Sequence, residues 1–112
     1  MEVSFGTGYL LTRFANQFET YGVDLNERMV NIARKNLKKI GLSVELYQAN
    51  IESLPFENKT FDTIVNTMAF SGYPYGNKAM SEICRVLKTR GRLIIIDINY
   101  PQNGNWVEKI TH

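Results

Sequence analysis

Residues suited to ligand binding stand at four points in the first 70 residues, and each point follows a run of apolar residues. Gly6 and Gly8 follow the first run, Asp24 ends the second, Asn50 follows the third, and Asn66 ends the fourth. If these runs are parallel strands, all four points lie at the carboxyl ends of the strands, where open α/β sheets bind ligands. The spacing therefore predicts one binding site for a nucleoside-containing ligand.

The glycines and the first acid each carry their own chemistry. Gly6 and Gly8 let the backbone come close to a ligand, and the helix that starts behind them offers unpaired N–H groups. The carboxylate of Asp24 can accept hydrogen bonds from both hydroxyls of a ribose. Each feature also has an ordinary explanation, because strand-to-helix turns often contain glycine and Asp often caps a helix. Their order along the chain favours ribose binding.

Residues near the second and third points are candidates to contact a nucleobase. Leu25 and Met29 would pack on a purine, although isolated apolar residues more often belong to a core. The amide of Asn50 and the backbone N–H of Ile51 could read the edge of an adenine. Alternatively, this loop only hydrogen-bonds itself.

Aromatic residues gather beyond the fourth point. Phe70, Tyr73 and Tyr75 follow the strand that ends at Asn66, and Tyr9 follows the glycine pair. They are candidates to line the pocket of a second, reacting ligand, but aromatic residues at strand ends are also common in cores and lids. No residue stands out as a catalytic base.

Apolar runs alternate with amphipathic stretches along the chain, which is typical of a parallel sheet covered by helices. The expected strands are residues 1–5, 20–24, 44–48, 61–66 and 92–99. The expected helices have apolar faces formed by Leu10, Leu11, Phe14 and Phe18, then Met29, Ile32, Ala33, Leu37 and Ile40, then Ala79, Met80, Ile83, Val86 and Leu87. Asn26 suits the N-cap of the second helix and Gly41 its C-terminal left-handed position.

Composition argues against several other functions. A chain of 112 residues with 44% hydrophobic residues suits one domain, and a net charge of +2 gives no reason to expect nucleic acid as a partner. Cys84 is the only cysteine and His112, the last residue, the only histidine. We therefore expect no metal site and no histidine-based triad. Cys84 lies in an apolar helical pattern, so we expect it to be buried.

The sequence also bears on location. No apolar stretch approaches transmembrane length, and Met1 is followed by an acid rather than by a basic segment and an apolar run. We expect no membrane insertion and a cytoplasmic location.

The longest motifs resemble those of the class I S-adenosylmethionine-dependent methyltransferases, in particular the small-molecule branch that includes the ubiquinone/menaquinone C-methyltransferases. Residues 49–56 (ANIESLPF), 61–65 (FDTIV), 79–88 (AMSEICRVLK) and 91–97 (GRLIIID) carry the resemblance. It implies an α/β fold, a Rossmann-like three-layer αβα sandwich whose mainly parallel sheet has the strand order 3-2-1-4-5.

The resemblance also implies a function, the transfer of a methyl group from S-adenosyl-L-methionine to a small-molecule acceptor. It assigns the cofactor residues in chain order: Glu2, Gly6, Thr7 and Gly8 at the methionine part, Asp24 at the ribose, Leu25 and Met29 beside the adenine, Asn50 and Ile51 at its edge, and Asn66 and Thr67 below the sulfonium. Tyr9, Tyr73 and Tyr75 are candidates to touch the acceptor.

The chain departs from the family pattern in the glycine loop and after the third expected helix. Ser4 replaces the first glycine of the loop and Phe5 a usually small residue, so both would add bulk where the backbone approaches the ligand. Arg90 stands where the family usually has glycine. If Arg90 takes a positive φ, it costs on the order of 1 kcal/mol.

The ends of the chain also differ from the family's seven-stranded fold, which has lid helices before the first strand and two more strands after the fifth. We expect residues 1–112 to be the cofactor-binding core of such an enzyme, without those parts. The strand at 92–99 would then be a sheet edge, whose unpaired backbone groups attract a partner. Either a homodimer forms through Leu93 to Ile98, or residues 105–110, where we expect the start of a helix, cover the edge.

Other functions stay open. A non-catalytic domain that binds S-adenosylmethionine or mediates an interaction is consistent with Ser4, Phe5 and the missing lid. A half-domain of an NAD-dependent dehydrogenase would share the glycine loop and Asp24, but its third glycine would stand where Leu11 is. A folded fragment without activity is the simplest alternative.

Overall fold

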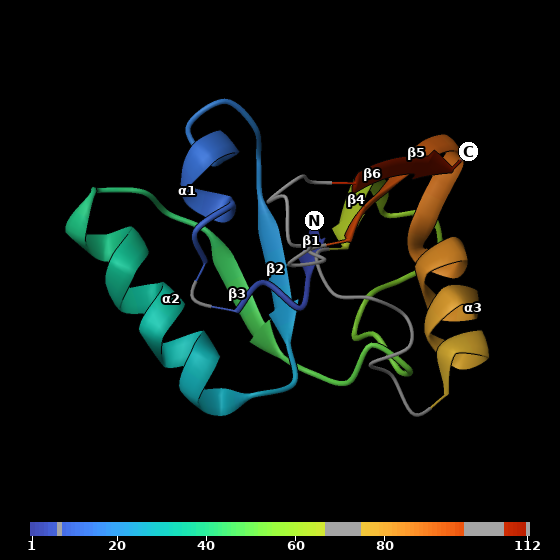
Figure 1. Cartoon of the computed structure of the whole chain (residues 1–112), viewed down its shortest axis with the longest axis horizontal. Helices are drawn as coiled ribbons and strands as arrows, with labels where there is room; N and C mark the ends of the chain where they lie inside the picture. The colour runs from blue at the N-terminus through green and yellow to red at the C-terminus, as the bar shows by residue number, and fades with distance from the viewer. Residues whose placement is uncertain (7, 67–74, 98–106, 112) are drawn as a thin grey trace.

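The computed structural model describes residues 1–6, 8–66, 75–97 and 107–111. Their strands form one sheet, with α1 and α2 on one side and α3 on the other (Figure 1). The elements are β1 (Glu2–Val3), α1 (Leu11–Phe14), β2 (Tyr21–Asp24), α2 (Glu27–Lys39), β3 (Glu45–Gln48), β4 (Phe61–Asn66), α3 (Gly76–Val86), β5 (Leu87–Asp97) and β6 (Val107–Thr111).

The sheet has the order β3-β2-β1-β4-β5-β6. Strands β1 to β5 pair in parallel, so the predicted order 3-2-1-4-5 and the mainly parallel α/β fold are confirmed. The short strand β1 is central, because Glu2 pairs with Gly22 of β2 on one side and with Val65 of β4 on the other. The carboxyl ends of β1, β2 and β4 therefore lie side by side, as the predicted site requires.

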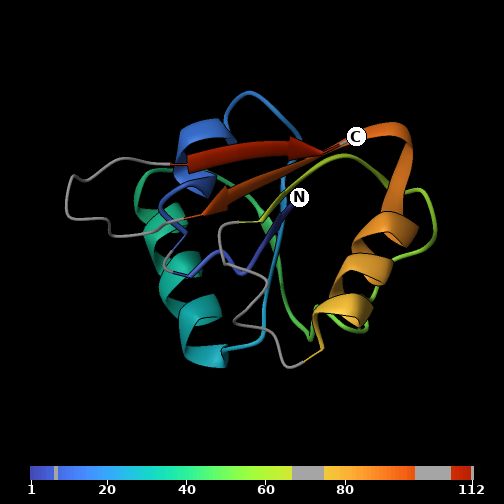
Figure 2. The same cartoon turned by 45° about the vertical axis from the view of Figure 1, so that its right-hand side comes forward.

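Strand β6 corrects the expectation of a helix at residues 105–110. Residues 107–111 pair antiparallel with β5, from Leu93 opposite Thr111 to Asp97 opposite Val107. Figure 2 shows the two strands side by side. Pairing with the unpaired backbone of β5 outweighs the weak helix preference of this segment. Of the two alternatives for the edge of β5, the structure shows coverage by the chain itself.

Two apolar clusters hold the layers together. The larger one lies between the sheet and α3 and consists of Val3, Val23, Ile51, Leu54, Phe61, Ile64, Ala79, Ile83, Val86 and Leu93. The smaller one, under α1 and α2, consists of Phe5, Leu11, Val30, Ala33 and Leu37. Each face of the sheet thus has its own cluster, and the central strands contribute Val3, Val23 and Ile64 to the larger one.

Several predicted core residues lie elsewhere. Helix α1 is only Leu11–Phe14, so Phe18 falls beyond it and is 65% exposed. Ile40 is 55% exposed because the chain leaves the helical conformation there. Leu87 packs against the larger cluster, but it has extended backbone angles and begins β5 instead of ending α3. Each error lies at the end of a helix, where periodicity is least informative.

Cys84 was expected to be buried but is exposed. Its neighbours on α3, Ile83 and Val86, point into the core. Cys84 lies one position away from Ile83 and therefore on another side of the helix.

Arg90 has φ 67°, as expected for a residue at a family glycine position. We expect Arg90→Gly to raise the free energy of unfolding by about 1 kcal/mol, because glycine takes this conformation without a Cβ clash. Urea denaturation measures the change. Arg92→Gly, on the same strand but without a positive φ, is the control and should destabilise the protein.

Candidate functional site

The carboxylate of Asp24 joins the first two parts of the predicted site. The backbone N–H of Gly6 donates to Oδ2 of Asp24 at 2.9 Å, and the N–H of Asn26 donates to Oδ1 at 2.9 Å. The carboxylate is thus held between the glycine loop and the start of α2. Each oxygen keeps a lone pair, so the group can still accept hydrogen bonds from two hydroxyls of a ligand.

The two glycines of the loop have different surroundings. Both have positive φ, 59° at Gly6 and 83° at Gly8. A Cβ on Gly8 would lie 2.9 Å from Cβ of Ala33 on α2, whereas a Cβ on Gly6 would meet nothing within 4 Å. Gly8 therefore allows α2 to pack against the loop. Gly6 faces open space, which a ligand can enter.

Phe5 does not crowd the ligand side of the loop, contrary to the expectation from its size. It is 5% exposed and belongs to the cluster under α1 and α2. Its ring packs where a Cβ on Gly22 would be, since such a Cβ would lie 2.8 Å from the ring. Ser4 adopts φ 57°, the left-handed conformation that glycine takes without strain.

We expect Ser4→Gly to stabilise the protein by about 1 kcal/mol, because the substitution removes the strain of a side chain at positive φ. The backbone bond from the N–H of Ser4 to the carbonyl of Val23, 2.7 Å long, remains available to glycine. The midpoint of thermal unfolding should rise. A lower midpoint would mean that contacts of the serine hydroxyl outweigh the strain.

The start of α2 is fixed beside Asp24. The side chain of Asn26 caps the helix by accepting from the N–H groups of Arg28 and Met29 at 2.9 and 3.3 Å, which confirms the predicted N-cap. Leu25 is 64% exposed, and its carbonyl accepts from Nε2 of Gln48 at 3.3 Å. An exposed leucine on a fixed backbone suits contact with the apolar face of a base.

The loop after β3 hydrogen-bonds to itself, which is one of the two alternatives considered for it. Oδ1 of Asn50 accepts from the N–H of Glu52 at 2.9 Å, and the carbonyl of Asn50 accepts from the N–H of Ser53 at 2.9 Å. The loop therefore bonds itself. Asn50 is nevertheless exposed and its oxygen keeps a second lone pair, whereas the side chain of Ile51 is buried in the core.

Glu82 and Arg85 of α3 were not among the predicted site residues, but their side chains bind the backbone of this loop. Oε1 of Glu82 accepts from the N–H of Leu54 at 2.8 Å. The guanidinium of Arg85 donates to the carbonyls of Leu54 and Phe56 at 3.0 and 2.8 Å, and to Oδ1 of Asn58 at 2.9 Å. The two side chains also form an ion pair of 2.6 Å. The signal in the sequence for this ion pair is the spacing of three positions, which places the two side chains next to each other on a helix.

The Glu82–Arg85 pair predicts a dependence of stability on pH. The hydrogen bond from Arg85 lowers the pKa of Glu82 in the folded protein. Its contribution is therefore complete above the carboxyl pKa of the unfolded chain and is lost as the pH falls through the lower folded value. We expect Glu82→Gln to be destabilising at pH 7 and less so in acid, below about pH 4. Urea denaturation from pH 3 to 7 tests this, with Glu57→Gln as control.

The remaining predicted residues are placed as follows. Glu2 and Asn66 are buried in β1 and β4, at 1% and 0% exposure. Tyr9 and Tyr75 are 70% and 62% exposed, and each has a cation over its ring, Arg13 at 6.0 Å and Lys78 at 5.1 Å. Thr7, Thr67, Phe70 and Tyr73 lie outside the described residues.

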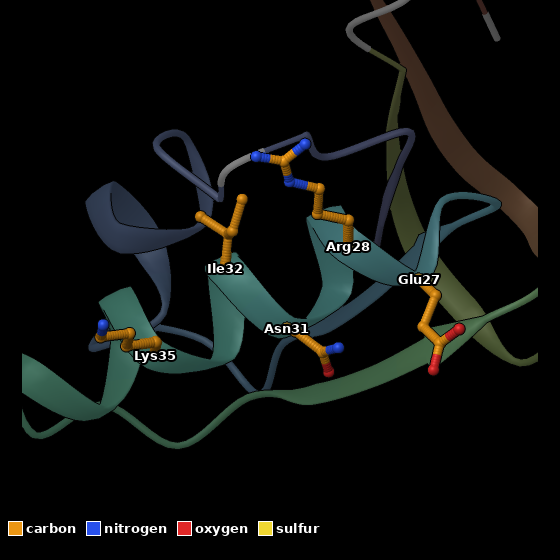
Figure 3. A pocket seen from close by; sticks show the side chains of 5 residues that line it. All are labelled: Glu27, Arg28, Asn31, Ile32 and Lys35. Atoms are coloured by element: carbon orange, nitrogen blue, oxygen red, sulfur yellow. The ribbon is translucent and has the colours of Figure 1, made fainter.

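Hollows on the described residues lie outside this constellation, including one of about 670 Å³ beside Asn58, Arg85 and residues 87–91. Another, of about 390 Å³, lies on α2 and is lined by Glu27, Arg28, Asn31, Ile32 and Lys35, which come from successive turns of one helix (Figure 3). A further hollow, of about 640 Å³, opens at the amino ends of β2 and β4 beside Tyr21 and Phe61. This last hollow is at the opposite end of the sheet from Asp24, so it is not the predicted site.

Among the described residues, no cluster of His, Cys, Asp and Glu suits a metal ion. The described helices are also too short or too polar to cross a membrane.

Residues 1–95 match the family model described as methyltransferase domain. The ubiquinone/menaquinone biosynthesis C-methyltransferase of Escherichia fergusonii is 35% identical over 107 residues, which cover 90% of this chain and 43% of that protein. The chain thus spans less than half the length of the curated relatives that it matches.

Solved structures share the fold. A SAM-dependent methyltransferase from Aquifex aeolicus superposes with a TM-score of 0.80 at 30% identity, over 86% of this chain and 54% of that chain. The [4+2]-cyclase SpnF superposes with a TM-score of 0.80 at 28% identity, over 86% of this chain and 37% of that chain.

Proposed function

This chain belongs to the methyltransferase domain family. We propose that it binds S-adenosyl-L-methionine and transfers the methyl group of this cofactor to a small-molecule acceptor. One observation carries the proposal. The carboxylate of Asp24 is fixed by the N–H of Gly6, beside a position where no atom would meet a Cβ within 4 Å. A ribose can bind this carboxylate while the rest of the nucleoside passes the open glycine.

The protein's own residues would act by positioning. When bound, the cofactor would supply a sulfonium methyl group to a nucleophile of the acceptor and would leave as S-adenosylhomocysteine. Asp24 would orient the ribose, Leu25 and Met29 would cover the adenine, and Asn50 with the N–H of Ile51 would bind its edge. Positioning and exclusion of water account for catalysis of such a displacement without a strong base.

The methionine end of the cofactor is assigned to the glycine loop and to the end of β4. Glu2, Gly6, Thr7 and Gly8 would surround the methionyl part, and Asn66 with Thr67 would lie below the sulfonium. Glu2 and Asn66 are buried in neighbouring strands, β1 and β4, which brings together two of the residues assigned to this end of the cofactor. Tyr9, Phe70, Tyr73 and Tyr75 stay candidates for the acceptor pocket.

The acceptor and the assembly are further proposals. One relative, of which this chain covers 43%, is a ubiquinone/menaquinone biosynthesis C-methyltransferase. Its name supports a small organic acceptor, and the partial coverage supports residues 1–112 as the core of a longer enzyme. The absence of a nucleic-acid partner and a cytoplasmic location stay predictions from the sequence. A homodimer through Leu93 to Ile98 would require β6 to leave the edge of β5.

A non-catalytic S-adenosylmethionine-binding domain is the second candidate. The [4+2]-cyclase SpnF shares the fold, and a fold does not fix the chemistry that it supports. An NAD-dependent half-domain is less well supported, because Leu11, at the position of the third glycine, is fully buried in the core.

Calorimetric titration tests the proposal. We expect S-adenosylhomocysteine to bind with a dissociation constant in the micromolar range, about −8 kcal/mol, and NAD to bind far more weakly. Tight NAD binding, or no binding of either ligand by folded protein, would contradict the proposal. Binding of S-adenosylmethionine without methylation of any quinol, phenol or amine offered would favour the non-catalytic domain.

A further inference from the structure

Resting on the proposed function, we propose that Glu82 and Arg85 are positioning residues for the adenine ring. They hold the loop after β3 at Leu54 and Phe56 and thereby set where Asn50 and Ile51 lie. Neither side chain reaches the adenine-binding residues directly. They act through the backbone of the loop.

The loop is anchored firmly at its far end. Leu54 is 5% exposed and lies in the larger core cluster. The ring of Phe56 packs edge-on against Tyr47 and Phe61, with centroids 5.0 and 4.9 Å apart. Arg85 then satisfies the carbonyls of both loop residues.

The near end of the loop is coupled to that anchor through a short turn. The N–H groups of Glu52 and Ser53 both donate to Asn50, to its side-chain oxygen and its carbonyl, at 2.9 Å each. Asn50 to Ser53 is therefore a bonded unit that directly precedes Leu54. A displacement of Leu54 shifts the whole unit, and with it the groups proposed to bind the adenine edge.

Helix α3 supplies a fixed reference for this coupling. Ala79, Ile83 and Val86 are all 0% exposed in the core. The guanidinium reaches three acceptors in the loop and Glu82 at once. A lysine ammonium carries the same charge but lacks the planar fork that this pattern requires, so Arg85→Lys separates geometry from charge.

The first experiment compares two ligands. S-Adenosylhomocysteine and S-inosylhomocysteine differ only at the base, where a carbonyl oxygen replaces the amino group of adenine. Calorimetry gives both affinities for the wild type, Arg85→Lys, Glu82→Gln and the control Arg92→Lys on β5. We expect Arg85→Lys to weaken S-adenosylhomocysteine binding about tenfold and to reduce the preference for it over the inosine analogue. Arg92→Lys should change neither quantity.

An unchanged preference in folded Arg85→Lys would overturn the positioning role, even if the variant is less stable, because a purely structural role lowers stability without altering base discrimination. Failure of the wild type to bind S-adenosylhomocysteine would instead overturn the proposed function.

A second measurement needs no ligand. Amide hydrogen exchange at Ile51, Glu52 and Ser53 should be faster in Arg85→Lys than in the wild type, with exchange in α2 unchanged. If exchange in the loop is unchanged as well, the pair does not hold the loop, whatever the ligand results.

Discussion

Asp24→Ala should reduce the affinity for S-adenosylhomocysteine by roughly 100-fold or more, since hydrogen bonds to a charged group contribute about 1.5–3 kcal/mol each and two are lost. The substitution also removes the acceptor of the N–H of Gly6 and of Asn26. The glycine loop and the start of α2 would then lose their shared anchor. Calorimetric titration measures the loss directly.

Asp62→Ala is the matched control for that result. Asp62 is also an aspartate at a strand of the same sheet, but it lies near the amino end of β4, its side chain is 85% exposed, and it contacts Lys88 at 3.3 Å. We expect the Asp62→Ala variant to bind S-adenosylhomocysteine with the same affinity as the wild type. Retention of tight binding by a folded Asp24→Ala protein would show that the ribose does not bind at this carboxylate.

Gly8→Ala should lower the free energy of unfolding by about 3 kcal/mol, a large part of the 5–15 kcal/mol typical of a domain. Two costs combine: a side chain at φ 83°, about 1–2 kcal/mol, and overlap with Cβ of Ala33 at 2.9 Å, about 1–3 kcal/mol. Because the overlap is with α2, the helix would shift relative to the loop. Urea denaturation gives the change in stability.

Gly6→Ala and Gly41→Ala separate the two costs. Both glycines have positive φ, 59° and 72°, and a Cβ on either would meet nothing within 4 Å. Each variant should therefore lose only about 1 kcal/mol of stability. Gly6→Ala should in addition weaken S-adenosylhomocysteine binding, whereas Gly41→Ala, at the far end of α2, should not. Equal losses of stability at Gly6, Gly8 and Gly41 would contradict the packing role of Gly8.

The sequence by itself determined the elements whose patterns are local. Asn26 at the N-cap of α2 and Gly41 beyond its end were predicted because capping and left-handed glycine depend on a few neighbouring residues. The strand order followed from the resemblance of the motifs to a known family, and the place of Asp24 at the end of a predicted strand, after the glycine loop, made it a candidate to bind a ribose.

Tertiary structure decided the features that depend on distant partners. Residues 107–111 form a strand because β5 offers an unpaired edge. Phe5 packs in the core, where the missing Cβ of Gly22 leaves room for its ring, and not on the ligand side of the loop. Arg85 binds carbonyls up to 31 positions away in the chain, and no periodicity reports such a contact. Local patterns fix backbone conformation, whereas packing across the sheet decides which side chains meet and so which of them can hold a ligand.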